Sequence, residues 1–349
     1  MTERRYPSLD LVPKASAPQS AKDFKTDQEV RWCPGCGDYA ILAAVQSFLA
    51  DQGARPESTV FISGIGCSSR FPYYMNTYGM HTIHGRAPAI ATGLAVARPD
   101  LDIFVITGDG DALSIGGNHL IHALRRNVNL TIILFNNEIY GLTKGQYSPT
   151  SPVGTVAKST PYGSIDEPLN PSTLALGAEA TFVARTIDRD RKHLTETLAA
   201  AHAHQGAALV EVLQNCPVFN DGAFSAVTDR DTKQEEGLVL VDGEPMVYGS
   251  ERTKGIAASA AGGIELIEGD DVAERAIVHD PSHDDPTRAF ALSRLRRTGG
   301  PMPIGILRQV QRPVYEQELL RQVDATREAE GDGELEALLT GGTTWNVEG

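Results

Sequence analysis

Hydrophobic and polar positions follow two alternating patterns between residues 38 and 215. Short, almost continuous apolar segments are typical of strands buried on both faces, and the segments between them have apolar residues at helical spacing. The expected strands are Ser58–Ser63, Leu101–Thr107, Asn129–Phe135, Thr181–Ile187 and Ala207–Leu213, and the expected helices span residues 38–53, 85–100, 114–127 and 189–205. Ser114 is the expected N-cap of the third helix. This alternation predicts an α/β fold with a mostly parallel sheet covered by helices on both faces.

The two ends of the chain carry weaker patterns. Residues 1–27 have no helical or strand periodicity and are expected to form a flexible or wrapping arm. Residues 226–349 are rich in glycine and acidic residues and include one amphipathic helix at Tyr315–Glu330. This C-terminal extension contains no chemical motif, and we expect it to serve packing or contact with a partner. Residues 28–225 therefore form the predicted functional domain.

Composition narrows the class of protein. The chain has 349 residues and a formal net charge of -14, from 31 basic and 45 acidic residues. This negative charge disfavours nucleic acid and anionic membrane surfaces as partners. The sequence has no apolar run of the roughly 18 residues that a membrane span needs, and no apolar signal segment at its start. We therefore expect a cytoplasmic protein of enzyme size.

Several polar and sulfur-containing residues directly follow the expected strands. Cys67, Gly108–Asp111, Asn136–Glu138 and Cys216 each lie just beyond the carboxyl end of one strand. In an open parallel sheet these ends share one edge, which is where ligands bind. The pattern therefore predicts that two cysteines, an aspartate and two asparagines gather at one edge of the sheet.

The four cysteines allow several interpretations. Cys33 and Cys36 form a Cys-x-x-Cys pair in the segment RWCPGCGDYA, and Cys67 and Cys216 are far from it in sequence. Alone, the pair fits a thiol redox site, half of a zinc site or two cluster ligands. Four cysteines also suffice for one tetrahedral zinc ion or one [4Fe–4S] cluster. A simpler alternative is that Cys67 and Cys216 are buried thiols.

A second motif points to a bound diphosphate. Gly108-Asp109-Gly110 is followed, after 25 intervening residues, by Asn136-Asn137. The glycines allow close approach of the backbone to a phosphate, and the next helix directs N–H groups toward the anion. Asp109, Asn137 and the carbonyl of Ile139 offer oxygen ligands of the kind that Mg²⁺ prefers. The spacing resembles the thiamine diphosphate fingerprint.

Together these motifs resemble the β subunit of 2-oxoacid:ferredoxin oxidoreductases, and the two-subunit 2-oxoglutarate type is the most similar branch. The resemblance covers about residues 28–225 and is carried by CPGCGDYAIL, GIGCSSRFPYYMNTYGMHTIHGRAPAIATG, GDGDALSIGGNHLIHALRRNVNL and NNEIYGLTKGQYSPTSPVGT. It implies a thiamine diphosphate-binding fold.

The resemblance also implies roles for individual residues. One [4Fe–4S] cluster would be bound by Cys33, Cys36, Cys67 and Cys216, and Mg²⁺ by Asp109, Asn137 and Ile139. Thiamine diphosphate would contact Gly108, Asp109, Gly110, Asp111, Asn137, Ile139 and Gly141. The expected catalytic or substrate-contacting residues are Arg70, His84, Leu142 and Lys144. Among these, Arg70 would pair with a substrate carboxylate, and Lys144 would face an anion such as coenzyme A.

The implied reaction is the oxidative decarboxylation of a 2-oxoacid, with 2-oxoglutarate giving succinyl-CoA and CO₂. Electrons would pass through the single cluster to a separate ferredoxin, because four cysteines leave none for a second cluster. An obligate α subunit, in an αβ or α₂β₂ assembly, would supply the carboxylate that activates the cofactor.

Three alternatives remain open at this stage. Pyruvate or another 2-oxoacid could be the substrate. The chain could be a non-redox thiamine diphosphate decarboxylase or synthase with a structural zinc ion. It could also be a scaffold protein that retains the fold without binding the cofactor.

Overall fold

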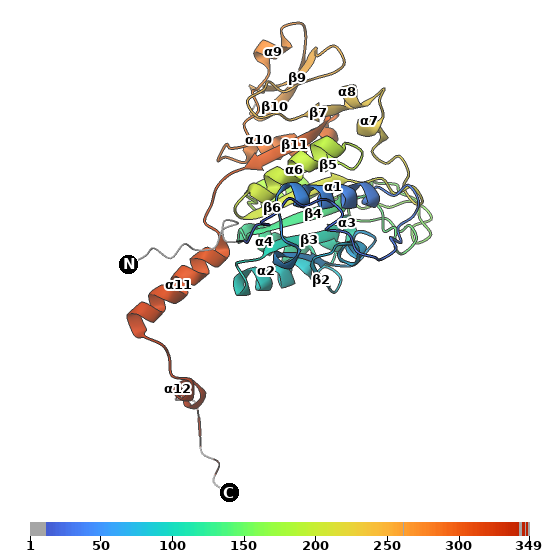
Figure 1. Ribbon diagram of the computed structural model, residues 1–349. Coiled ribbons are helices and arrows are strands. Elements are labelled where there is room, and N and C mark those ends of the chain that lie inside the picture. The colour runs from blue at the N-terminus through green and yellow to red at the C-terminus, as the bar shows by residue number, and fades with distance from the viewer. Residues whose placement is uncertain (1–11, 261, 342–343, 346, 348–349) are drawn as a thin grey trace.

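The computed structural model describes residues 12–260, 262–341, 344–345 and 347. Its centre is an eight-stranded sheet in the order β2-β1-β3-β4-β6-β5-β11-β7 (Figure 1). All neighbouring strands are parallel except β11 and β5, which are antiparallel. The strands are β1 (Thr59–Ser63), β2 (Tyr78–His81), β3 (Asp102–Gly108), β4 (Leu130–Asn136), β5 (Phe182–Ile187), β6 (Ala207–Leu213), β7 (Gly237–Val239) and β11 (Met302–Gln309).

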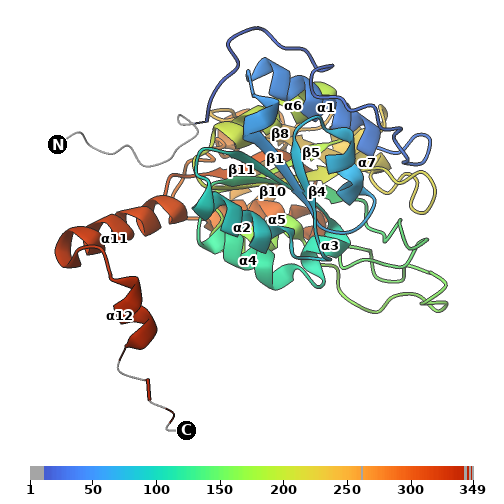
Figure 2. The same cartoon turned by 60° about the horizontal axis from the view of Figure 1, so that its bottom comes forward.

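Helices cover both faces of this sheet, because successive residues of the central strands are apolar on both sides (Figure 2). Phe104 and Ile106 face α1 (Asp38–Asp51) and α6 (Arg191–Ala203), whereas Ile103 and Val105 face the opposite layer. That layer contains α2 (Ala87–Ala97), α4 (Gly117–Arg125), α5 (Pro171–Gly177) and α10 (Thr287–Ser293). The predicted fold class is confirmed.

The five predicted strands agree with β1, β3, β4, β5 and β6 to within one residue at each end. The predicted N-cap is wrong. Ser114 ends the short helix α3 (Asp109–Leu113), and its N–H donates to the Gly110 carbonyl at 3.3 Å. The segment directly after β3 forms α3, and helix α4 therefore begins only at Gly117.

Part of the C-terminal extension belongs to the central sheet. Strands β11 and β7 extend it beyond β5, and α10 packs against the same core. The boundary predicted after residue 225 therefore does not separate two sheets.

A small antiparallel sheet contains β8 (Val247–Tyr248), β9 (Lys254–Ala258) and β10 (Ile264–Glu268). The remaining helices of the extension are α7 (Ser225–Thr228), α8 (Lys233–Glu236), α9 (Val272–Arg275), α11 (Tyr315–Glu330) and α12 (Leu335–Thr340).

Helices α11 and α12 lead away from the body of the molecule (Figures 1 and 2).

Of the predicted N-terminal arm, residues 1–11 lie outside the described residues. The rest of the arm lies on the body, where Phe24 is fully buried and Lys25 pairs with Met75. No helix in the described ranges has the length and apolar character needed to cross a membrane.

Candidate functional site

The loops that follow β1, β3 and β4 converge on one cavity of about 100 Å³ at the carboxyl edge of the sheet. Its lining includes Cys67, Gly108, Asp109, Asn137 and Gly141. These residues are far apart in sequence, and the parallel strand order brings them together as predicted. This edge is the usual ligand-binding side of such a sheet.

Asp109 is held at the base of this cavity with only 3% of its surface exposed. Its Oδ2 atom accepts hydrogen bonds from the hydroxyls of Ser148 at 2.5 Å and Thr150 at 2.6 Å. Burial raises the pKa of the Asp109 carboxyl above its ordinary value, while the two hydroxyls act in the opposite direction. A nearby cation would strengthen the second effect and favour the carboxylate.

Asn137 and Ile139 follow β4 in a tight loop in which Glu138 has a left-handed backbone, with φ of 56°. The Asn137 amide donates to Gln214 Oε1 at 2.8 Å, and its own Oδ1 accepts the Ile139 N–H at 3.2 Å. Both ends of the Asn137 side chain are therefore fixed, and the residue lines the cavity beside Asp109. Burial raises the pKa of the neighbouring Glu138 to about 8, so its carboxyl is largely neutral at pH 7.

Two glycines bring the backbone close to its neighbours. A Cβ on Gly110 would overlap the ring of Tyr140, whose hydroxyl donates to the Gly110 carbonyl at 3.1 Å. A Cβ on Gly141 would lie 3.5 Å from Cys67 Sγ and 3.6 Å from Cys216 Sγ. Gly141 therefore lines the cavity and also lies beside two of the four thiols.

The Cys33–Cys36 loop lies against the segment that carries Cys216. Gln214 Nε2 donates to Cys36 Sγ at 3.3 Å, and the Gly37 N–H donates to the Asn215 carbonyl at 3.1 Å. Cys36 is close enough to Cys67 and Cys216 for their charges to affect it, and Cys33 likewise affects Cys67. All four thiols are free, and those of Cys67 and Cys216 both lie beside the same glycine, Gly141.

Burial makes it unfavourable for these thiols to lose their protons. Burial raises the pKa of Cys36 far above the ordinary thiol range and that of Cys67 to about 12. Burial also raises the pKa of Asp38, which directly follows the loop, to about 7. Thiolates would therefore be costly here unless a positively charged group bound them.

His84 and Asp111 form a pair among the residues that line the first cavity. His84 Nδ1 lies 2.7 Å from Asp111 Oδ1. The same carboxylate accepts the N–H groups of Ile65 at 3.0 Å and Gly85 at 2.7 Å, and the hydroxyl of Thr107 at 2.7 Å. Asp111 is thus engaged by protein donors, which fix the loops after β1 and β2, and both Asp111 and His84 line the cavity.

Arg70 lines an adjoining cavity of about 480 Å³, which shares Ile65, Gly66 and Leu142 with the first. Arg31 also lines this second cavity, although it pairs with Glu29 at 2.8 Å. Lys144 is exposed and lines neither cavity, since the chain turns away at this residue with φ of 75°. The structure therefore groups Arg70 and Leu142, but it does not bring Lys144 to them.

Sequence reasoning missed several side chains at this site. Buried Ser68 and Asp38 line the first cavity, and no described residue forms a hydrogen bond with their side-chain oxygens. Gln214 joins the cysteine loop to Asn137. The hydroxyl-rich run Ser148-Pro149-Thr150-Ser151 was a signal for the Asp109 contacts, but its distance from Asp109 in sequence concealed them.

The atoms available as ligands suit the two groups that the motifs imply, a magnesium-bound diphosphate and an iron–sulfur cluster. Asp109, Asn137 and Ile139 provide oxygen donors beside glycines and an unpartnered Ser68 hydroxyl, which suits a magnesium-bound diphosphate. Four free thiols, two of them beside Gly141, suit an iron–sulfur cluster.

Fold and site together define a thiamine diphosphate-dependent enzyme. Residues 64–212 match the family model of the thiamine pyrophosphate enzyme C-terminal TPP-binding domain. This segment contains the cavity-lining residues of the loops after β1, β3 and β4.

Known relatives define the family more narrowly. The chain is 59% identical over 341 residues to the 2-oxoglutarate oxidoreductase subunit KorB of Mycobacterium tuberculosis, covering 97% of this chain and 91% of the relative. It is 38% identical to the β subunit of 2-oxoacid:ferredoxin oxidoreductase 1 of Aeropyrum pernix, covering 83% and 81%. The chain therefore belongs to the β subunits of 2-oxoacid:ferredoxin oxidoreductases, as its motifs predicted.

A solved structure shares the fold. It is the 2-oxoglutarate:ferredoxin oxidoreductase from Magnetococcus marinus with 2-oxoglutarate, coenzyme A and succinyl-CoA bound. The match has a TM-score of 0.74 and 35% sequence identity, and it covers 95% of this chain and 99% of the other.

Proposed function

We propose that this chain is the catalytic β subunit of an enzyme that oxidatively decarboxylates 2-oxoglutarate to succinyl-CoA and CO₂, with two electrons passing to ferredoxin. The observation that carries the proposal is the position of Gly141, which lines the cavity of Asp109 and Asn137 and lies beside the thiols of Cys67 and Cys216. Thiamine diphosphate in that cavity would lie next to an iron–sulfur cluster bound by these thiols, which would accept its electrons.

The residues divide into two sets of ligands. Asp109, Asn137 and the Ile139 carbonyl would hold Mg²⁺, and Gly108, Gly110 and Ser68 would face the diphosphate. When bound, thiamine diphosphate supplies the carbanion chemistry for decarboxylation, and the cluster accepts electrons one at a time. His84, oriented by Asp111, would hold or move a proton on the substrate side of the cavity.

An iron–sulfur cluster fits the thiols better than a single zinc ion does. No three His, Cys, Asp or Glu side chains in the described part of the chain are grouped closely enough to ligate one metal ion. One zinc ion would require its thiolates to share a single centre. In a [4Fe–4S] cluster each cysteine binds a different iron, so a wider arrangement of thiols is expected.

The choice of 2-oxoglutarate rests on the second cavity and on two similar proteins whose names include it. Arg70 faces this cavity, and a guanidinium pairs well with a carboxylate, which 2-oxoglutarate has at both ends and pyruvate only at one. Leu142 would contact the apolar part of the substrate. Lys144, which lines neither cavity, would serve coenzyme A or a partner at the surface.

A second subunit is expected to complete the site. The first cavity, at about 100 Å³, is smaller than the roughly 300–1,000 Å³ of ordinary ligand pockets. The exposed side chains of Ile83, Leu142 and β2 surround this region and would be covered by an α subunit. That subunit would also supply the carboxylate that activates the cofactor.

The proposal is tested with the αβ complex reconstituted with iron and sulfide without oxygen. Coenzyme A-dependent ferredoxin reduction is measured with 2-oxoglutarate and pyruvate, together with iron, sulfide and zinc content. We expect about four iron atoms and a clear preference for 2-oxoglutarate. Equal rates with pyruvate would overturn the substrate, and about one zinc without iron would overturn the cluster.

A further inference from the structure

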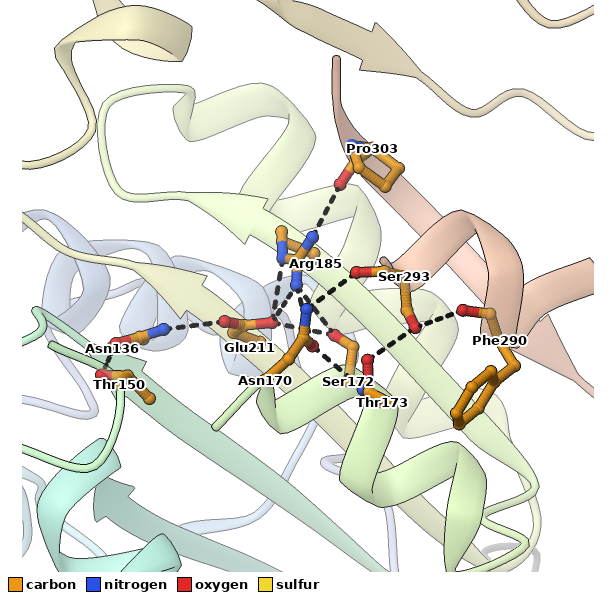
Figure 3. A network of polar contacts seen from close by, with 10 residues as sticks. All are labelled: Asn136, Thr150, Asn170, Ser172, Thr173, Arg185, Glu211, Phe290, Ser293 and Pro303. Atoms are coloured by element: carbon orange, nitrogen blue, oxygen red, sulfur yellow. Dashed lines mark hydrogen bonds and ion pairs between the residues drawn. The ribbon is translucent and has the colours of Figure 1, made fainter. Parts of the chain in front are cut away.

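A buried ion pair lies within the central sheet and belongs to a network of polar contacts (Figure 3). Arg185 of β5 and Glu211 of β6 are paired at 2.9 Å, and their side chains are only 5% and 2% exposed. Ser172 of α5 donates a further hydrogen bond to Glu211 Oε2 at 2.8 Å. Burying two charges carries a large desolvation cost, so such a pair is weak evidence for stability alone and raises the question of function.

Contacts lead from this pair to Asp109. Asn136 Nδ2 donates to Glu211 Oε1 at 2.8 Å, which fixes the amide so that its Oδ1 faces Thr150. Thr150 Oγ1 lies 3.0 Å from that Oδ1 and 2.6 Å from Asp109 Oδ2. Its single hydroxyl hydrogen is therefore shared between the two acceptors, with the closer and charged carboxylate favoured.

We infer that Thr150, held through Asn136 by the Glu211–Arg185 pair, is a positioning residue for the metal-binding carboxylate of Asp109. The inference rests on the proposed Mg²⁺–diphosphate site. Ser148 and Thr150 both bond Oδ2 of Asp109, so Oδ1 is the oxygen presented to the metal. Outer-shell partners of metal ligands commonly affect metal affinity by about 10- to 100-fold.

The loop that contains Thr150 is itself locked in place. Ser151 Oγ donates to the Glu138 carbonyl and accepts the Ser148 N–H at 2.7 Å. The loop is thus tied to the segment after β4, which carries Asn137 and Ile139. The loop therefore connects the two halves of the proposed metal-ligand set, through Thr150 to Asp109 after β3 and through Ser151 to the segment after β4.

The test uses calorimetric titration of the αβ complex with thiamine diphosphate at graded Mg²⁺ concentrations. Thr150→Val removes the hydroxyl at nearly constant volume and is expected to raise the Mg²⁺ requirement about 10- to 100-fold. Thr150→Ser retains the hydroxyl and should remain within about threefold of wild type. Thr173→Val is the matched control, because Thr173 contacts Ser293 at the far end of the network (Figure 3).

Thermal unfolding of the cofactor-free complexes separates positioning from general damage. Thr150→Ala is measured in parallel, since it removes the hydroxyl without adding a methyl group in its place. If Thr150→Val and Thr150→Ala fold and bind as wild type does, the inference is overturned. A different result would contradict the proposed function itself. In that case Asp109→Ala would bind Mg²⁺ and thiamine diphosphate as tightly as wild type.

Discussion

At the scale of single residues, Gly110 is a tightly constrained backbone position at the site. Any side chain there would displace the Tyr140 ring and with it the loop that contains Ile139 and Gly141. We therefore predict that Gly110→Ala weakens thiamine diphosphate binding by the αβ complex by about tenfold or more, because a misplaced ligand set loses at least one hydrogen bond to a charged group.

Gly117→Ala provides the control for this prediction. Gly117 is in the first turn of α4, and a Cβ there would meet no heavy atom of the described residues within 4 Å. This variant should bind the cofactor normally and unfold at an equal or slightly higher temperature. Normal cofactor affinity in Gly110→Ala, measured by the same titration, would contradict the role given to the close Tyr140 contact.

Sequence motifs identified the residues that offer ligand atoms, but not the residues that hold them. Asp109, Asn137 and the cysteines follow strands, so the parallel sheet alone predicts their meeting. Thr150 and Gln214 act through contacts with residues distant in sequence, which no periodicity reveals. The ionised residues inside apolar strands, Arg185 in TFVARTI and Glu211 in AALVEVL, were the available signal for a buried network.

At the scale of elements, buried central strands were predictable and edge strands were not. Segments such as Thr59–Ser63 are buried on both faces, which makes them nearly continuous in apolar residues. The four side chains of β2 are all exposed, so Tyr78–His81 lacks the alternation that marks a strand. Strand β11 contains Pro303 and Gly305, both unusual inside strands, and its pairing with β5 depends on residues more than a hundred positions away.

Helix α11 is anchored at its start by a buried carboxyl, which gives a pH-dependent prediction. Glu316 accepts the Asn129 N–H at 3.1 Å, and burial raises its pKa from 4.5 to about 7. Between these values the folded chain retains a proton that the unfolded chain has released, so stability falls as pH rises from 4.5 to 7. Glu316→Gln keeps an acceptor and removes the charge, and should therefore stabilise the chain at pH 8 by up to about 3 kcal/mol.

Urea unfolding of the isolated chain at pH 5 and pH 8 checks this sign. The gain from Glu316→Gln should be large at pH 8 and small at pH 5. Glu328→Gln, at an exposed position of the same helix, should change little at either pH. A gain of equal size at both pH values would show that the effect comes from packing rather than from ionisation of Glu316.

At the scale of the whole molecule, the functional domain and the C-terminal extension share one hydrophobic core. Leu238, Leu292 and Leu307 from the extension pack in the same cluster as Ile132 and Val183. Arg185 of the buried network also reaches the Pro303 carbonyl of β11 at 3.5 Å (Figure 3). The extension thus supports the strands that carry the proposed site, in addition to the partner contact expected from the sequence.

The contribution of the extension to folding can be tested by truncation at two points. A chain ending after residue 225 loses β7, β11 and α10, which exposes the apolar face of β5 and leaves its edge unpaired. We predict that this chain aggregates or unfolds without a cooperative transition, because exposed apolar strand edges pair between molecules. A chain ending after residue 333 loses α12, where Leu335, Leu338 and Leu339 are each at least 69% exposed, and should unfold cooperatively near the wild-type temperature. Circular dichroism during heating distinguishes the two outcomes, and cooperative unfolding of the shorter chain would show that residues 226–333 form a separate layer rather than part of one core.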